Sequence, residues 1–280
     1  MPELPEVETV RTGLERSLVG RRFAHVEARR PNLRFPIPAN LSRRLQDREV
    51  VRVNRRAKYL QIILDDSTVV ILHLGMSGKV NLLPLPNSGE HNAPAKHDHL
   101  VFDLDDASRM VYNDTRRFGF IALSTEGELD QHDYFRDMGP EPLGNAFNAE
   151  VLSAALRGKA TPIKSALLDQ RVVAGLGNIY VCEALFDSGI SPRRKALSVA
   201  GKRAERLVPA IKDVLQRAIA AGGSTLRDYQ QLDGESGYFQ HNFRVYGREG
   251  EVCVTPGCKK DIVRITQSGR STFFCSSCQR

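Results

Sequence analysis

Four of the five cysteines form two close pairs near the end of the sequence. Cys253 and Cys258 are separated by VTPG, Cys275 and Cys278 by two serines, and sixteen residues lie between the pairs. This spacing supplies four thiolates for one tetrahedral Zn²⁺. Two disulfides are the alternative, which a cytoplasmic location disfavours. We expect one structural zinc ion, whose binding supplies the folding free energy of a tail too small to form a core.

The N-terminal stretch MPELPEVE sets a proline directly after Met1 and places Glu3, Glu6 and Glu8 close to the chain end. Apolar residues then recur at helical intervals, at Val7, Val10, Leu14 and Leu18. Pro5 suits a first helical turn, and acidic residues there offset the positive end of the helix dipole. Helix initiation alone therefore accounts for the glutamates, and a chemical role for them stays open at this point.

Positive charge is concentrated in one part of the chain. The formal net charge is +7, and between Arg21 and Lys58 twelve Lys or Arg residues stand against three acidic ones. This pattern favours a nucleic-acid partner. For any single Arg pair, a solvated strand edge is the alternative.

The elements that must position these residues change type along the chain. Residues 22–30, 49–64, 68–73, 99–104 and 109–123 are mostly short, rich in β-formers and separated by turn residues, which predicts strands. The group 105–108 predicts a hairpin. Pro and Gly then cluster at 137–148, and the segments beyond have helical spacing. Cys182 lies within one of these helical runs, and we expect it to be a buried small apolar residue.

We therefore expect an α+β multidomain protein. The predicted parts are an N-terminal β domain with one helix at 1–135, a hinge at 136–149, a helical domain with a long loop at 150–240 and a zinc hairpin at 241–280. The 41% apolar and 26% charged residues are ordinary for a soluble globular protein. No stretch approaches the roughly 18 to 20 apolar residues of a membrane span, and the start lacks a secretory signal, so we expect a cytoplasmic, nucleoid-associated location and no membrane partner.

Three further motifs combine flexible backbone with functional side chains. HLGMSGK at 73–79 places His73 and Met76 on a Gly-bounded turn, and NDTRRFG at 113–119 ends a strand with two arginines and a phenylalanine. GLGNIY at 175–180 puts Asn178 at a helix start, where backbone N–H groups can hold a phosphate. Taken singly, each motif has an ordinary alternative, such as a core side chain or a helix cap.

Taken together, the motifs are more specific. MPELPEVE, RRAKYL, HLGMSG, NDTRRFG, PIKSALLDQ, AGLGNIY and the Cys-x4-Cys-x16-Cys-x2-Cys tail stand in one order. In this order and spacing the chain closely resembles the formamidopyrimidine-DNA glycosylases over its whole length. The related endonuclease VIII group typically opens with PEGPE, whereas this chain has PELPE.

The resemblance implies a bifunctional base-excision enzyme. Such an enzyme removes oxidised purines, chiefly 8-oxoguanine and formamidopyrimidines, and cleaves the strand at abasic sites by β,δ-elimination. It also implies an N-terminal β-sandwich, a helix-two-turn-helix domain with a lesion-capping loop and a C-terminal zinc finger. The implied partner is double-stranded DNA containing oxidised purines or abasic sites, and a monomer suffices to bind one lesion.

The resemblance assigns the chemistry to the chain's start. Removal of Met1 leaves Pro2 with a free secondary amine, whose reference pKa near 8 keeps a useful fraction neutral at pH 7. Attack by Pro2 on the sugar C1′ expels the base and forms a Schiff base, while Glu3 acts as general acid and base on the sugar. By the same resemblance Lys58 is a third catalytic residue, which the family places near the lesion and its phosphate. Glu6 is expected to position the flipped nucleotide, and Tyr238 resembles part of the segment that closes over it.

Other residues are implied to hold the bent duplex after the target base has left the stack. Phe118 is the wedge between base pairs, Met76 fills the vacated space and Arg116 faces the orphaned base. Phosphates around the flipped nucleotide are implied to be held by His73, Lys164, Asn178 and Arg270.

Thr115 is a departure from the family, in which NDPRRFG is common, and it loosens the backbone just before Arg116.

Two alternatives for the function remain open on the sequence. One is a pyrimidine-directed endonuclease VIII-type glycosylase on the same scaffold. The other is a non-catalytic zinc-containing nucleic-acid-binding protein.

Overall fold

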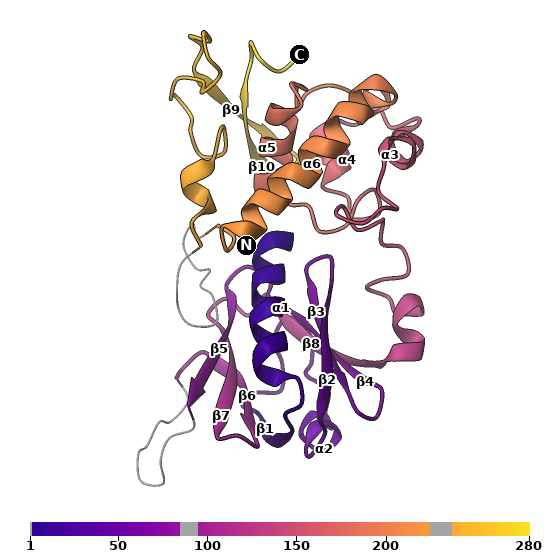
Figure 1. The fold of residues 1–280 in the computed structure, drawn as a ribbon, viewed down its shortest axis with the longest axis vertical. Coiled ribbons are helices and arrows are strands. Elements are labelled where there is room, and N and C mark those ends of the chain that lie inside the picture. The colour runs from indigo at the N-terminus through magenta and orange to yellow at the C-terminus, as the bar shows by residue number, and fades with distance from the viewer. Residues whose placement is uncertain (1, 85–94, 225–236) are drawn as a thin grey trace. The chain divides into compact units, whose positions relative to one another are not determined.

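The computed structural model describes residues 2–84, 95–224 and 237–280, which form two compact units (Figure 1). Residues 1–136 and 222–238 make up the first unit, and residues 137–221 and 239–280 the second. The break after residue 136 lies at the start of the expected hinge. Residues 222–224 and 237–238, expected with the helical domain, cluster instead with the first unit, where Ser224 is hydrogen-bonded to Glu6.

The first unit is a sandwich of two four-stranded antiparallel sheets with one long helix, α1 (Leu4–Leu18). One sheet has the order β1-β6-β7-β5, and the other β2-β3-β4-β8. The elements are β1 (Phe23–Ala28), α2 (Leu41–Leu45), β2 (Val50–Arg56), β3 (Tyr59–Leu64), β4 (Thr68–His73), β5 (Gly78–Pro84), β6 (Asp98–Leu104), β7 (Ser108–Asp114), β8 (Phe120–Thr125) and η1 (Glu126–Gln131).

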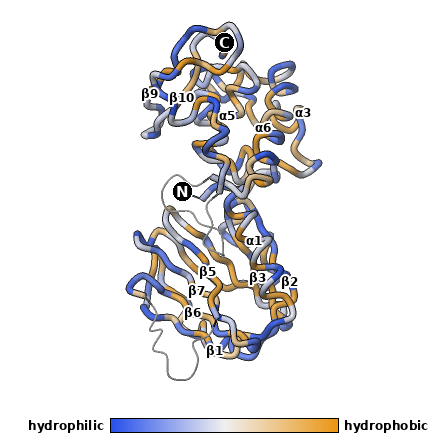
Figure 2. The backbone as a smooth tube through the Cα atoms, turned by 60° about the vertical axis from the view of Figure 1, so that its left-hand side comes forward, coloured by the Kyte–Doolittle hydropathy of each residue, from blue (hydrophilic) through white to orange (hydrophobic). Residues whose placement is uncertain are grey.

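The core of this unit lies between the sheets and under α1. Val7, Val10, Leu14 and Leu18 are at most 1% exposed and belong to the same apolar cluster as strand residues such as Leu60. Each such side chain contributes roughly 1.5–3 kcal/mol by leaving water. Hydrophobic stretches follow the strands of this unit in Figure 2. The residues that recur at helical spacing in the sequence therefore form the buried face by which α1 packs on the sandwich.

Two predicted strands are each two strands in the structure. The range 49–64 folds back at Ala57 and Lys58 between β2 and β3, and Ala57 has φ +53°. The range 109–123 is interrupted by a loop between β7 and β8. No Gly or Asn marks the first turn, so the sequence carries no local signal for it. The hairpin predicted at 105–108 is confirmed, with Asp103 opposite Arg109.

The second unit combines helices with a two-stranded hairpin. Its helices are α3 (Ala149–Leu156), α4 (Ile163–Leu167), α5 (Asn178–Asp187), η2 (Ala196–Val199), α6 (Lys202–Ala220) and η3 (Phe239–Asn242), and its strands are β9 (Ile262–Gln267) and β10 (Arg270–Cys275). Cys182 is 1% exposed and packs with Phe186 of α5 against Ile262 and Phe273 of the hairpin, as expected for a small apolar residue. This shared core makes the helices and the hairpin one unit. No helix in the described part of the chain is long and apolar enough to cross a membrane.

Candidate active site and DNA interface

The chain's start is buried and held rigidly. Pro2 is buried, and Glu3, the N-cap of α1, is 2% exposed. The backbone N of Glu3 donates to Glu6 Oε2 at 2.8 Å, while the Glu3 side chain accepts from the backbone N of Glu6. This reciprocal capping box satisfies N–H groups that a helix start leaves open. The glutamates do start the helix, and they also fix the residues next to Pro2.

Glu6 has a second set of partners far along the chain. Its Oε1 accepts from the backbone N of Ser224 at 2.8 Å and from Ser224 Oγ at 3.0 Å. Gly223 has φ +81°, and a Cβ there would lie 3.1 Å from Glu6. Glu6 therefore connects the start of α1 to the beginning of the segment expected to cap the lesion.

Of the loop from Thr225 to Tyr246, in which the lesion-capping segment is expected, the stretch 225–236 lies outside the described residues. Tyr238, just after it, is 62% exposed and pairs in an isolated bridge with Ser224.

Lys58 and His73 lie at corresponding ends of neighbouring strands. Lys58 precedes β3, and His73 ends β4 opposite Tyr59. Burial, followed by the charges of Lys58 and Arg34, lowers the pKa of His73 to about 4. Nδ1 of His73 accepts from the backbone N of Gly75 at 3.0 Å, which assigns the proton of the neutral ring to Nε2. The structure thus brings together a lysine and a neutral histidine donor, a pair suited to a phosphate.

The turn with Met76 and the loop with Arg116 and Phe118 approach each other closely. Gly75 has φ +63°, and a Cβ there would lie 2.3 Å from the backbone N of Gly119. Only glycine fits at this position. Met76 is half-buried, whereas Phe118 is 42% exposed and lies under the Arg116 guanidinium at 4.7 Å. The three residues expected to fill and wedge the duplex therefore come from adjoining segments.

Asp114 holds the loop between β7 and β8, residues 115–119, from its buried side; this loop is called the wedge loop below. Asp114 is fully buried, and its carboxylate accepts from Ser77 Oγ at 2.6 Å, from the backbone N of Gly119 at 2.8 Å and from the backbone N of Arg116 at 3.2 Å. Sequence reasoning missed Asp114 and Ser77. An acidic residue at a strand end followed by a polar loop was the signal that could have found Asp114.

In the second unit, Lys164 and Asn178 both contact strand β10. Lys164 is fully buried, and its Nζ donates to Ser271 O at 2.7 Å and Thr272 Oγ1 at 2.6 Å. Asn178 begins α5, and its Nδ2 donates to Ser271 O at 3.0 Å. Arg270, the preceding residue, is exposed. Lys164 and Asn178 thus fix the strand that presents Arg270.

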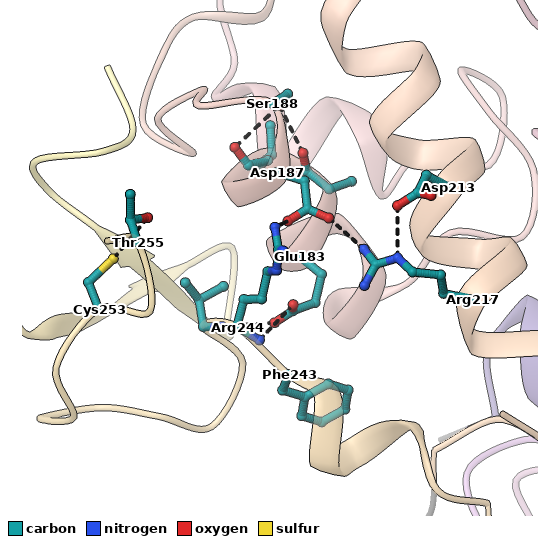
Figure 3. Close-up of polar contacts among 12 residues, drawn as sticks. Glu183, Asp187, Ser188, Asp213, Arg217, Phe243, Arg244, Cys253 and Thr255 are labelled. Atoms are coloured by element: carbon teal, nitrogen blue, oxygen red, sulfur yellow. Dashed lines mark hydrogen bonds and ion pairs between the residues drawn. The ribbon is translucent and has the colours of Figure 1, made fainter. Parts of the chain in front are cut away.

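A buried carboxylate orders the chain between α5 and the hairpin (Figure 3). Glu183 is 1% exposed and accepts from the backbone N of Arg244, Val245 and Tyr246 at 2.8–3.0 Å. Burial raises the pKa of Glu183, although the three N–H donors act in the opposite direction. Asp187, one turn on, pairs with Arg217 at 2.7 Å and Arg244 at 2.8 Å. Sequence reasoning missed Glu183 because its partners are backbone groups about 60 residues away.

The four tail cysteines converge. Their Sγ atoms all lie within 4.8 Å of one another, with Cys253 3.8 Å from Cys278 and Cys258 3.7 Å from Cys275. Thiolates about 2.3 Å from a shared tetrahedral centre are about 3.8 Å apart, whereas a disulfide bond is about 2.05 Å long. Burial raises the pKa of Cys253, but hydrogen bonds from Thr255 and the neighbouring thiols bring it down to about 7. The donor set fits one zinc ion and not two disulfides.

Comparisons with known proteins agree with this geometry. Residues 1–121 match the formamidopyrimidine-DNA glycosylase N-terminal domain, and residues 138–230 match the formamidopyrimidine-DNA glycosylase H2TH domain. Proteins named formamidopyrimidine-DNA glycosylase from Rhodospirillum centenum and Dinoroseobacter shibae are 58% and 55% identical, each over 100% of both chains.

Solved structures of the family superpose on the chain. A Lactococcus lactis protein in complex with Fapy-dG-containing DNA has a TM-score of 0.89 at 36% identity, covering 100% of both chains. The Thermus thermophilus protein has a TM-score of 0.86 at 37% identity, covering 99% of this chain and 98% of that one. These matches define a DNA glycosylase of base excision repair. The chain belongs to the formamidopyrimidine-DNA glycosylase family, whose enzymes also have AP lyase activity.

Proposed function

We propose that this chain excises oxidised purines, 8-oxoguanine and formamidopyrimidines, from double-stranded DNA and then cleaves the abasic site by β,δ-elimination. Relatives in the same family support this substrate class, since solved complexes of the Lactococcus lactis protein contain Fapy-dG or abasic-site DNA. The observation that carries the proposal is the rigid start of α1, where Pro2 and Glu3 are buried beside the Glu6 carboxylate. A protein that only binds DNA needs no such ordered chain end.

Pro2 is the nucleophile in this mechanism. With Met1 removed, its neutral secondary amine attacks the sugar C1′, and the electron pair of the glycosidic bond leaves with the base. Pro2 then loses its amine proton, and the C1′–O4′ bond breaks to give an iminium with O4′ released as a hydroxyl. The iminium draws electrons from C2′, which acidifies the C2′ proton and permits the two eliminations. Glu3, as general acid, donates a proton to the sugar ring oxygen as the ring opens, and its carboxylate then stabilises the developing cation. Glu6 positions the flipped nucleotide, and Tyr238 belongs to the segment that closes over it.

DNA binding is distributed over both units. Lys58 and His73 bind phosphate in the first unit. There Met76 fills the space left by the extruded base, Phe118 wedges between base pairs and Arg116 faces the orphaned base. Asn178 and Arg270 bind phosphate in the second unit, and Lys164 supports that contact through its hydrogen bonds to β10. We further propose that the basic protein associates with the nucleoid through these contacts.

Cys253, Cys258, Cys275 and Cys278 would hold one structural zinc ion. The support for this is the mutual approach of the four Sγ atoms and the small size of the hairpin around them. Bound zinc would neutralise thiolates that otherwise repel one another and would fix the open end of the hairpin, where β9 begins and β10 ends. Arg270 would then be presented on a hairpin of fixed geometry.

The test is borohydride trapping on defined duplexes. The protein with Met1 removed, verified by intact mass spectrometry, should form a covalent adduct with 8-oxoguanine duplex, and Pro2→Gly should lose most of it. Glu3→Gln should bind the duplex but form little adduct. Equal or greater trapping on thymine glycol duplex would favour the endonuclease VIII-type alternative. Tight, salt-dependent binding without any adduct would leave the non-catalytic alternative.

A further inference from the structure

A tight loop beside the wedge carries an exposed arginine and an exposed phenylalanine. The loop follows β1, and it is closed by hydrogen bonds from Leu33 N to Phe35 O at 3.0 Å and from Ile37 N to Pro31 O at 2.9 Å. Leu33 and Ile37 are buried in the sandwich core. The anchored sides of the loop leave Arg34 and Phe35 at its exposed tip.

This tip contacts the wedge loop directly. The backbone N of Arg34 donates to Gly119 O at 3.1 Å, one residue after Phe118. The ring of Phe35 meets the ring of Phe120 edge to face at 5.2 Å. The tip and the wedge loop are therefore in direct contact, so both must approach a ligand together.

The two segments also present the same kind of side-chain pair. Phe35 and Phe118 are each 42% exposed, and they are the two phenylalanines exposed on the described surface. Each lies under a guanidinium, that of Arg34 at 5.4 Å and that of Arg116 at 4.7 Å. An arginine stacked on an aromatic ring keeps its N–H groups directed outward for a bidentate contact with phosphate.

The charge of Arg34 has no acidic partner among the described residues. Over residues 2–84, 95–224 and 237–280, no acidic side chain forms an ion pair with it. Its charge also acts on the nearby rings, because it lowers the pKa of His73 along with burial and Lys58. A cation so placed, among Lys58, His73 and Arg116, suits a polyanion and not a neutral ligand.

We propose that Arg34, supported by Phe35, binds a backbone phosphate of the DNA duplex next to the site of the wedge. The contact rests on the proposed function, since it extends the DNA surface assigned there to Arg116 and Phe118. It adds to that surface a residue outside the quoted motifs, one of the twelve basic residues between Arg21 and Lys58. Its effect is on affinity, because the guanidinium neutralises one phosphate and releases the counterions condensed there.

The experiment measures binding to a duplex with a central tetrahydrofuran abasic analogue, by fluorescence anisotropy between about 50 and 200 mM salt. Arg34→Ala should weaken binding about eightfold near 0.1 M salt and reduce the slope of log K against log salt by about 0.9. Arg34→Lys should retain most of the slope. The matched control is Arg43→Ala, which removes another exposed arginine charge, from α2 of the same unit, and should bind as the parent does.

The contact would be overturned if Arg34→Ala bound the duplex with the affinity and the salt slope of the parent protein. Loss of the same affinity in both variants would also overturn it, because only the overall charge would then matter. Borohydride trapping of the parent protein on abasic DNA is measured in parallel. A parent that traps, combined with an unaltered Arg34→Ala, refutes this inference alone, whereas a parent that neither binds nor traps refutes the proposed function as well.

Discussion

Glu6 and Ser224 are joined by two hydrogen bonds although 218 residues separate them in the chain. The same carboxylate caps α1 through the backbone N of Glu3, so one buried side chain serves the helix start and the beginning of the segment after α6. Because Glu6 is 1% exposed, water cannot replace either partner. The order of the chain's start thus depends on a residue near the end of the helical region.

Glu6→Gln should therefore lower both stability and base excision. The amide cannot accept from Glu3 N and Ser224 N at once, so one buried donor loses its partner, at a cost of about 1–3 kcal/mol. Urea unfolding and single-turnover excision of 8-oxoguanine measure the two effects. Glu15→Gln, on an exposed turn of the same helix, is the control and should be near neutral. Equal behaviour of the two variants would contradict a linking role for Glu6.

His73 predicts a specific pH dependence of stability. Its pKa in the folded protein is about 4, below the ordinary value of 6.5, so between these values the unfolded chain binds a proton that the folded protein does not. Stability should fall as the pH decreases through this window, by at most about 3 kcal/mol in all. His73→Gln should flatten the fall, measured by urea midpoints from about pH 7 to about pH 4.5. His25→Gln, at an exposed position, should leave the profile unchanged, and parallel profiles for all three proteins would refute the assignment.

Local patterns predicted a large share of this molecule. The spacing of Val7, Val10 and Leu14 gave the helix, since a buried face needs only neighbours within the same element. The cysteine spacing likewise predicted a cluster, because thiol ligands and short knuckles are a local feature. The turn at Ala57 was missed, since a left-handed alanine has no sequence signature.

Long-range partners explain what the sequence did not predict. Lys164 is fully buried because Ser271 O and Thr272 Oγ1, more than 100 residues later, accept from its ammonium. Nothing near Lys164 in the sequence indicates such acceptors. Resemblance pointed to this lysine, but the contacts that define how it acts arise from tertiary structure alone.

Removal of metal should unfold the C-terminal hairpin selectively. Native mass spectrometry should find one zinc per chain, lost together with DNA affinity on chelation, because the apolar cluster that the hairpin shares with α5 is small and includes the cysteine ligands themselves. Cys278→Ser should lose zinc, whereas Cys182→Ala, in the adjoining apolar core, should retain it. A metal-free protein with full DNA affinity, or zinc loss in Cys182→Ala alone, would contradict the assignment.

Glu183 should stabilise the second unit and, through it, the DNA contact proposed for Asn178. Glu183→Gln replaces one of two accepting oxygens by a donor facing backbone N–H groups, which should cost about 1–3 kcal/mol. Tyr246, whose backbone N Glu183 holds, accepts through its hydroxyl from Asn178 Nδ2 at 3.4 Å, so DNA affinity should fall as well. Urea unfolding and anisotropy on the abasic-analogue duplex measure both quantities. The matched control is Glu205→Gln, at an exposed position in the first turn of α6. If Glu183→Gln were as stable as this control and bound DNA as tightly, the buried carboxylate would have no role in ordering the second unit.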